Sequence, residues 1–401
     1  MVLLGSTGSV GRQAVEVLLA NPDRFTVVGL AAAGSRPDLL AEQARALRVR
    51  QVVVARAEAA EATARNLPGA AGLAVGDRAV GELAGTGVDV VLNALDGAAG
   101  LPATLAALEA GSTLALANKE SLVVGGELVT SRAAPGQITP VDSEHSAIAQ
   151  CLRAGTPAEV AALVLTASGG PFRGRDRDSL RAVTPAQAMA HPTWSMGPLV
   201  TVNSATLMNK GLEVLEAHHL FGVDFDRIRV VVHPQSTVHS MVEFTDGSTI
   251  AQVSRPDMKL PIALGLGWPD RVPGAVPAMD WTRPQGWSFE PVDARAFPAL
   301  ELAITAGRAG GTAPAVLNGA NEVAVAAFVD GRLSFLGIAD TVGAVLDRHR
   351  RVDRPTLEQL QGADTWARAA AAALVRGDEP EPNPAQPNPA QPKPAQEDQA
   401  L

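Results

Sequence analysis

Short apolar runs alternate with segments of helical periodicity along roughly the first 140 residues of the chain. The apolar runs lie at 2–4, 25–30, 52–54, 88–92 and 113–117, and the helical segments between them include 12–19 and 39–47. Continuous apolar strands separated by helices are typical of a parallel sheet covered on both faces. The pattern therefore predicts an α/β fold over residues 1–142. The first run is shorter than the usual strand of about five or six residues, so we expect the native chain to start before Met1.

The pattern changes after residue 142, where longer strands are mixed with helices up to residue 267. The predicted strands lie at 160–166, 228–232, 237–244 and 248–253. Asp246-Gly247 stands between the last two strands, and this dipeptide is a strong signal for a hairpin turn. Residues 143–267 are therefore predicted to form an α+β domain.

Three further segments differ in composition. Residues 268–298 are rich in proline and tryptophan and predict a connecting arm. Residues 299–377 are alanine-rich and predict a helical C-terminal domain. Residues 378–401 repeat Asn-Pro-Ala-Gln-Pro, a composition that cannot bury a core, so we expect this tail to be disordered.

Composition and charge exclude several classes of protein. The net charge of −9 and the pI of about 5.3 argue against a nucleic-acid partner. No secretory signal is visible, and no apolar run reaches the roughly 18 residues that a membrane span needs. Cys151 is the single cysteine, which excludes an intrachain disulfide and predicts a cytoplasmic protein. The chain has only four lysines, so each of them is informative: Lys119, Lys210, Lys259 and Lys393.

The glycine-rich segment 5–11, Gly-Ser-Thr-Gly-Ser-Val-Gly, follows a predicted strand and opens a helix. Such a turn lets backbone N–H groups approach a pyrophosphate at a helix N-terminus. The alternative is a turn that needs glycine only for packing. The second strand leads to Gly34, Ser35 and Arg36 instead of the carboxylate that selects NAD, so NADP is favoured. An ordinary exposed loop arginine is the alternative for Arg36.

Acidic residues in the segment Val-Asp-Ser-Glu-His suggest a metal site. If residues 142–144 are extended, the carboxylates of Asp142 and Glu144 project to the same face. Two hard oxygen ligands suit Mg²⁺ or Mn²⁺ with water in the open positions, and Glu213 is the best candidate for a third. His145 is interpreted as structural, because a hard cation prefers oxygen. The alternative for the whole segment is a solvated acidic loop.

Hydroxyl, amide and ammonium groups that could bind a phosphate lie in two segments. Ser168 ends a strand at a glycine turn, and Ser204 precedes a predicted helix that carries Asn209, Lys210 and Glu213. Together such groups can coordinate a phosphate dianion, although Ser204 could be only a helix cap and Lys210 a surface residue. The segment 191–197, His-Pro-Thr-Trp-Ser-Met-Gly, is either a lid over substrate or a buried loop.

Taken together, these segments resemble the 1-deoxy-D-xylulose 5-phosphate reductoisomerase family of the non-mevalonate isoprenoid pathway. The resemblance covers residues 2 to about 345 in family order, through GSTGSVG (5–11), LANKESLV (116–123), PVDSEHSAI (140–148), ASGGPF (167–172), HPTWSMG (191–197), NSATLMNKGLE (203–213), HPQSTVHSM (233–241) and NGANEVAVAAF (318–328). It implies a homodimer whose subunit has a Rossmann-like NADPH domain, a catalytic domain and a C-terminal helical domain.

The resemblance also implies roles for individual residues. Asp142, Glu144 and Glu213 would bind one divalent metal ion per subunit. Lys119 and Ser143 would contact the reacting end of a small phosphorylated sugar substrate, and His191 and Trp194 would close over it. The substrate phosphate would be held by Ser168, Ser204, Asn209 and Lys210. The NADPH site would be lined by Thr7, Gly8, Ser9, Val10, Gly34, Ser35, Arg36, Asn118, Glu120 and Gly197.

The implied reaction rearranges the ketose phosphate skeleton and reduces the resulting aldehyde to 2-C-methyl-D-erythritol 4-phosphate. Three features depart from the family pattern: the loop Gly34-Ser35-Arg36, the proline-rich tail, and Asp96, an unusual charge beside the cofactor. One alternative is an aspartate-semialdehyde dehydrogenase, which needs a cysteine nucleophile, but Cys151 has an apolar helical context. The other is an NADP-sensing regulatory protein, which needs neither the carboxylates nor the lysines.

Overall fold

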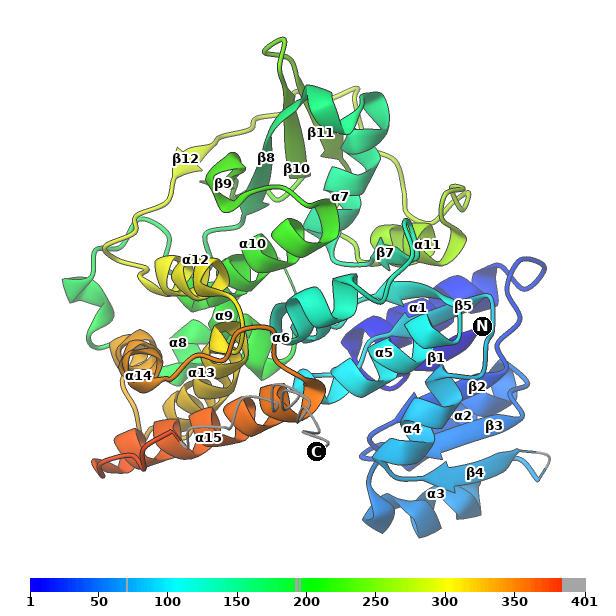
Figure 1. Ribbon diagram of the computed structural model, residues 1–401. Coiled ribbons are helices and arrows are strands. Elements are labelled where there is room, and N and C mark those ends of the chain that lie inside the picture. The colour runs from blue at the N-terminus through cyan, green and yellow to red at the C-terminus, as the bar shows by residue number, and fades with distance from the viewer. Residues whose placement is uncertain (70, 192–193, 195, 384–401) are drawn as a thin grey trace, which may run out of the picture.

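The computed structural model describes residues 1–69, 71–191, 194 and 196–383, and it has three regions (Figure 1). The N-terminal region is a sheet flanked by helices, the middle region holds a second sheet, and the C-terminal region is helical. In Figure 1 the helix α10 (Met208–Phe221) lies between the second sheet and the C-terminal helices. The three regions are those expected from the sequence; the domain boundaries given there remain a prediction.

The N-terminal region is a seven-stranded sheet in which every neighbouring pair is parallel. Its strands are β1 (Val2–Leu4), β2 (Gly29–Ala32), β3 (Gln51–Val54), β4 (Gly72–Val75), β5 (Val90–Asn93), β6 (Thr113–Leu116) and β7 (Ile138–Pro140). The helices are α1 (Ser9–Ala20), α2 (Pro37–Ala46), α3 (Ala60–Asn66), α4 (Asp77–Ala84), α5 (Leu101–Glu109) and α6 (Lys119–Thr130). The order β4-β3-β2-β1-β5-β6-β7 reverses direction between β1 and β5, where α/β sheets bind their ligands.

The apolar runs predict the central strands of the sheet but not the outer strands β4 and β7. β2 begins at Gly29, four residues after the predicted start at 25. β4 is partly exposed, and β7 ends in proline at the edge of the sheet, so neither presents a continuous apolar run.

The second sheet has five strands in the order β11-β10-β8-β9-β12. They are β8 (Val160–Ala167), β9 (Ile228–Val232), β10 (Val238–Phe244), β11 (Thr249–Val253) and β12 (Glu290–Pro291). β10 and β11 form the antiparallel hairpin that Asp246-Gly247 predicted. The helices of this region are α7 (Ser143–Cys151), α8 (Pro185–Ala188) and α9 (Pro198–Thr206) together with α10, and α7 packs against β10 and β11.

The helix α11 (Lys259–Gly267) returns from the second sheet to the first. Its buried residues Ile262 and Leu266 belong to the same core as Leu3, Val15 and Val141. It packs against α1, so late residues complete the core of the N-terminal sheet.

The C-terminal helices are α12 (Ala299–Ala309), α13 (Ala313–Val329), α14 (Phe335–Arg348) and α15 (Leu357–Arg376). α13 packs against α12, α14 and α15. Among the described residues no helix has both the length and the apolar character to cross a bilayer.

The structure corrects the start of the expected disordered tail. Trp366 Nε1 donates to the backbone oxygen of Glu381 at 3.1 Å, and Asn383 Nδ2 lies 2.7 Å from His349 Nδ1. Pro380 is buried. Residues 378–383 therefore contact the C-terminal helices, because a proline can pack and a backbone carbonyl can accept a bond in any composition. The remaining tail, 384–401, lies outside the described residues.

Candidate active site

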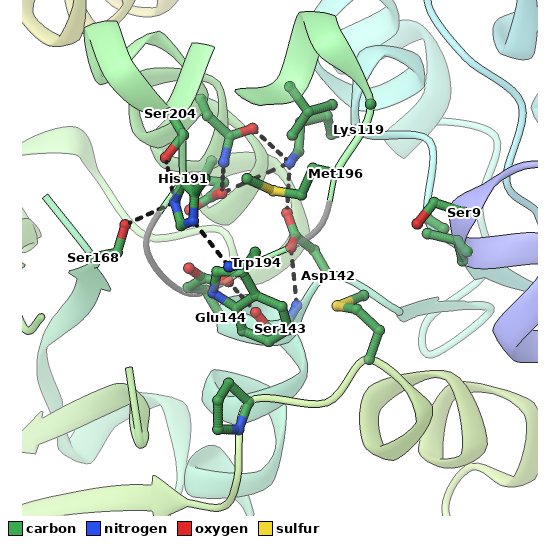
Figure 2. Close-up of a pocket in the computed structure, with 18 of the residues that line it drawn as sticks. Ser9, Lys119, Asp142, Ser143, Glu144, Ser168, His191, Trp194, Met196 and Ser204 are labelled. Carbon is green, nitrogen blue, oxygen red and sulfur yellow. Dashed lines mark hydrogen bonds and ion pairs between the residues drawn. The ribbon is translucent and has the colours of Figure 1, made fainter. Parts of the chain in front are cut away.

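A cavity of about 790 Å³ lies between the N-terminal sheet and the middle region (Figure 2). It is lined by the glycine turn, by the loops after β5, β6 and β7, and by residues of the middle region. Residues expected to form the metal, phosphate and cofactor sites come together here: Gly8, Ser9, Val10, Lys119, Glu120, Asp142, Ser143, Glu144, Ser168, His191, Trp194, Gly197, Ser204, Asn209, Lys210 and Glu213.

The parallel strands explain how distant segments reach one cavity. The carboxyl ends of β1, β5, β6 and β7 lie at the same edge of the sheet, because all their pairings are parallel. β6 leads into Lys119 at the start of α6, and β7 leads into Asp142 at the start of α7. The other wall of the cluster is α10, which carries Asn209, Lys210 and Glu213.

Three carboxylates face one another in this cavity, those of Asp142, Glu144 and Glu213. One oxygen from each lies within 4.8 Å of the others. Asp142 has an extended backbone, but residues 142–144 do not form the expected extended segment, because α7 begins at Ser143 and Asp142 caps it: the Ser143 N–H donates to Asp142 Oδ1 at 2.9 Å. A Ser, Thr, Asp or Asn at a helix start accepts such a bond, and Glu144 then lies in the first turn.

Two lysines neutralise the carboxylates. Lys119 Nζ lies 3.0 Å from Asp142 Oδ2 and 3.7 Å from Glu213 Oε1. Lys210 Nζ lies 2.7 Å from Glu144 Oε1 and also pairs with Glu213 Oε2. These ion pairs place Lys210 among the carboxylates in this structure, whereas the sequence expectation placed it at the phosphate.

Burial and neighbouring charge determine the pKa values here. Burial and the Glu144 carboxylate raise the pKa of Glu213 to about 7. Burial alone would raise the pKa of Asp142, but Lys119 and His145 outweigh it and hold the pKa below its usual value. Burial alone would lower the pKa of Lys119, but the carboxylates outweigh it and raise the pKa. The cluster therefore attracts positive charge.

The carboxylate cluster fits a divalent cation. Among the described residues, Asp142 Oδ2 and Glu213 Oε2 are buried and accept no hydrogen bond; Lys119 and His145 lie beside the first and Lys210 beside the second. Hard oxygen ligands suit Mg²⁺ or Mn²⁺.

The hydroxyls of Ser168 and Ser204 converge on His191. Their Oγ atoms lie 3.2 and 3.1 Å from His191 Nε2 (Figure 2). The Trp194 N–H donates to His191 Nδ1 at 2.9 Å, so Nδ1 is an acceptor and Nε2 carries the ring proton. Burial lowers the pKa of His191, which favours this neutral form. Two hydroxyls and an N–H donor at one point suit the binding of a phosphate oxygen.

The segment 191–197 lines the cavity through its described residues. His191, Trp194, Met196 and Gly197 all face the cavity, which agrees with a lid and not with a loop buried in a core. Pro192, Thr193 and Ser195 lie outside the described residues.

The expected cofactor residues divide into two groups. Gly8, Ser9, Val10, Glu120 and Gly197 line the cavity. Thr7, Gly34, Ser35, Arg36 and Asn118 do not line it. The loop of Gly34, Ser35 and Arg36 follows β2, and β2 pairs in parallel with β1. It therefore lies at the same sheet edge as the glycine turn.

The side chain of Asn118 binds backbone and side-chain atoms of the protein itself. Its Nδ2 donates to the backbone oxygens of Leu95 and Gly97, both at 2.9 Å, and to Glu120 Oε2 at 2.8 Å. It therefore holds the loop after β5, where Asp96 lines the cavity. Burial raises the pKa of Asp96 and raises that of Glu120 to about 7.

Residues without an expected role also line the cavity, and Ser236 and His239 are two of them. Both belong to the motif HPQSTVHSM (233–241). His239 is buried, and its Nε2 has no hydrogen-bond partner among the described residues. That motif was the available signal in the sequence.

Cys151 lies at the C-terminal end of α7 and is buried. Burial raises the pKa of its thiol to about 11, and it does not line the cavity. This geometry argues against a cysteine nucleophile and hence against a dehydrogenase of the aspartate-semialdehyde type.

Sequence models of one family match most of the chain. Residues 1–126 match the model described as 1-deoxy-D-xylulose 5-phosphate reductoisomerase, 138–221 its C-terminal domain, and 253–370 the DXP reductoisomerase C-terminal domain. The chain belongs to the 1-deoxy-D-xylulose 5-phosphate reductoisomerase family. Relatives with this name include a Leifsonia xyli protein, 61% identical over 94% of this chain and 98% of the relative. A Kitasatospora griseola protein is 59% identical over 94% of this chain and 100% of the relative.

Solved structures of reductoisomerases share the fold. The Zymomonas mobilis enzyme in complex with NADPH has a TM-score of 0.87 and 41% identity, over 93% of this chain and 98% of that one. A second reductoisomerase, in complex with NADPH, fosmidomycin and magnesium, has a TM-score of 0.87 and 36% identity, over 94% and 98% of the two chains. These comparisons confirm the family, the enzyme class and the fold class expected from the sequence.

Proposed function

We infer that the chain converts 1-deoxy-D-xylulose 5-phosphate into 2-C-methyl-D-erythritol 4-phosphate, and we propose that it does so in the central cavity. The observation that carries this proposal is the meeting of three carboxylates, two lysines and the glycine turn around one cavity. A regulatory NADP-binding protein would need the glycine turn alone.

The carboxylates of Asp142, Glu144 and Glu213 are proposed to hold Mg²⁺ or Mn²⁺. When bound there, the cation supplies Lewis acidity that stabilises negative charge on the substrate's carbonyl oxygen. Lys119 lies beside the same carboxylates, with its Nζ 3.0 Å from Asp142 Oδ2 and 3.0 Å from Asn209 Oδ1, and its ammonium would add positive charge near that oxygen. Ser143, whose hydroxyl donates to Glu144, would orient the substrate hydroxyl.

The phosphate is proposed to lie against Ser168, Ser204 and His191, with Asn209 and Lys210 from α10, which adjoin the carboxylate cluster. This group does not react, so its binding energy serves to orient the reacting carbons. Trp194 and Met196 cover the cavity with apolar surface, which would keep water from the reaction.

NADPH is proposed to bind along the glycine turn at Thr7, Gly8, Ser9 and Val10, and it supplies the hydride for the reduction. Gly197 and Glu120 line the adjoining part of the cavity, and Asn118 holds the loop beneath it. Gly34, Ser35 and Arg36 are proposed to bind the 2′-phosphate, because a serine and an arginine at the end of β2 replace the acid of NAD-binding folds.

The test is an assay of the purified full-length chain. We expect loss of nicotinamide absorbance when 1-deoxy-D-xylulose 5-phosphate, Mg²⁺ and NADPH are all present, and no loss when EDTA replaces Mg²⁺. NADPH binding without turnover under any of these conditions would support the regulatory alternative.

We also propose a homodimer that uses the edge of the second sheet. β11 is an edge strand, and its residues Thr249, Ile250 and Ala251 are exposed. An exposed edge is a template for pairing with another chain. Light scattering should give twice the mass of one chain, and Ile250→Lys should lower the measured mass.

For localisation we propose the cytoplasm, since the single buried thiol of Cys151 suits a reducing compartment.

A further inference from the structure

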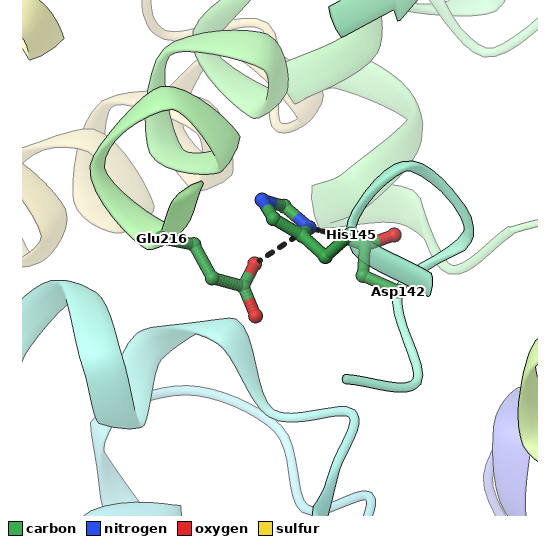
Figure 3. A group of neighbouring side chains, drawn as sticks. All are labelled: Asp142, His145 and Glu216. Carbon is green, nitrogen blue, oxygen red and sulfur yellow. Dashed lines mark ion pairs between the residues drawn. The ribbon is translucent and has the colours of Figure 1, made fainter. Parts of the chain in front are cut away.

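Two charged residues lie behind the carboxylate cluster and do not reach the cavity. His145 on α7 and Glu216 on α10 are 0% and 1% exposed, and neither lines the cavity. They are therefore out of contact with substrate. Figure 3 shows both side chains pointing toward each other and toward Asp142.

The hydrogen-bond directions around the imidazole are fixed by its neighbours. His145 Nε2 lies 2.8 Å from the backbone oxygen of Glu213, so Nε2 donates. Nδ1 lies 3.5 Å from Glu216 Oε2 and 3.7 Å from Asp142 Oδ2. Nδ1 and Glu216 Oε2 are both buried, and within the described part of the chain neither has a hydrogen-bond partner. Each polar edge of the ring thus faces an acceptor.

The imidazole consequently links the supports of two proposed cation ligands. One ring nitrogen contacts the carboxylate of Asp142, which caps α7, and the other contacts the backbone of Glu213 on α10. Glu216 lies three residues after Glu213 on the same helix, so it fixes the ring from the α10 side. The ring also stacks on Phe221, with centroids 6.3 Å apart, which restricts its rotation.

We propose that His145 and Glu216 are positioning residues that hold Asp142 and Glu213 in the arrangement required by the divalent cation. The inference rests on the proposed cation site. A buried carboxylate costs free energy unless it is paired, and the only cationic group that Glu216 meets within 4 Å among the described residues is the His145 ring. Removing the Glu216 charge frees the ring to turn away from Asp142.

The experiment measures Mn²⁺ binding to the full-length chain by electron paramagnetic resonance, without substrate or NADPH. Glu216→Gln keeps the shape of the side chain and removes its charge. We expect the Kd for Mn²⁺ to rise by about 10- to 100-fold, the usual cost of losing a group that orients a metal ligand. NADPH affinity, measured by fluorescence, should be unchanged.

Asp364→Asn is the matched control, because Asp364 Oδ2 pairs with Arg368 Nε at 2.7 Å on α15, outside the cavity. It removes a partly buried ion pair and should leave the Mn²⁺ Kd unchanged. A lower melting temperature with an unchanged Mn²⁺ Kd in Glu216→Gln would show a merely structural role and overturn the proposal. If Glu216→Gln does not fold, Glu216→Asp carries the test with the same expectation and a smaller rise.

A double-mutant cycle tests whether Glu216 affects the cation ligands through His145. His145→Gln combined with Glu216→Gln should raise the Mn²⁺ Kd by no more than the larger single change. If the two substitutions raise the Mn²⁺ Kd additively, Glu216 does not act through His145 and the proposal is overturned. The proposal would also be overturned if the wild-type chain bound two Mn²⁺ ions and Glu216→Gln lost one of them, because Asp142, His145 and Glu216 would then form a cation site of their own. A wild-type chain that binds no Mn²⁺ would contradict the proposed cation site and this inference together.

Discussion

Lys119 Nζ and Asp142 Oδ2 lie 3.0 Å apart, although the two residues follow different strands. β6 and β7 are parallel neighbours, so the residues that follow them meet at one edge of the sheet. Glu213 comes to the same pair from α10, with its Oε1 3.7 Å from Lys119 Nζ. The N-terminal sheet thus supplies part of the proposed cation site, and the middle region completes it.

Glu213→Gln should reduce kcat/KM by at least about 10²-fold, because it removes one charged ligand from an electrostatic site. The measurement is NADPH oxidation at saturating Mg²⁺, with a Mn²⁺ titration to register the loss of cation affinity. Glu301→Gln, on the exposed face of α12, is the control and should behave like the wild type. Turnover close to normal in Glu213→Gln would remove Glu213 from the site.

Arg36→Ala should lower the ratio of kcat/KM for NADPH over NADH by about tenfold or more. A charge-assisted bond to the 2′-phosphate is worth roughly 1.5–3 kcal/mol, and NADH lacks that group. Arg50→Ala provides the control, since Arg50 is exposed immediately before β3, at the amino ends of the strands and not at the carboxyl ends where Arg36 lies. An unchanged ratio would mean that another residue reads the phosphate.

Lys210→Ala distinguishes two roles for this ammonium. If it serves the phosphate, kcat/KM should fall by about 10²-fold, near 2.7 kcal/mol, for the phosphorylated substrate and barely change for 1-deoxyxylulose. That is the expected outcome, because a bound cation would compete with Lys210 for Glu144 and Glu213. Equal losses on both substrates would assign Lys210 to the carboxylate cluster alone.

Cys151→Ser should retain kcat within about twofold. Burial holds the thiol pKa at about 11, so the thiolate is scarce at neutral pH, and the side chain does not reach the cavity. Steady-state kinetics at pH 7 and 9 would check this. A loss of turnover greater than the loss of folded protein would revive a cysteine-dependent mechanism.

Truncation after Asn383 should leave both activity and melting temperature unchanged. Truncation after Gly377 removes the Trp366–Glu381 hydrogen bond and buried Pro380, and should lower the melting temperature by about 2 °C. Calorimetry of the two truncated chains beside the full chain measures the difference. Identical melting temperatures for all three would show that residues 378–383 contribute nothing to stability.

Some of this arrangement is readable from the sequence. Alternating apolar runs and amphipathic helices predict the parallel sheet, although they miss its outer strands β4 and β7. The turn at Asp246-Gly247 predicts the β10–β11 hairpin for the same local reason.

Other features depend on tertiary contacts that no local pattern reports. The extended conformation expected for residues 142–144 was wrong, because the helix α7 begins at Ser143 and Asp142 caps it. The pairing of Lys210 with Glu144 joins residues 66 positions apart. The contact between His145 and the Glu213 backbone likewise exists only after α7 and α10 have docked.

The packing of α11 has a consequence for biosynthesis. Ile262 and Leu266 fill the core around Leu3 and Val141, so a ribosome must pass residue 266 before the first sheet can be finished. Until then the nascent chain exposes an apolar face, the kind of surface that chaperones bind and that promotes aggregation. A fragment of residues 1–142 should therefore express poorly alone, and co-expression with a segment that contains α11 should rescue it.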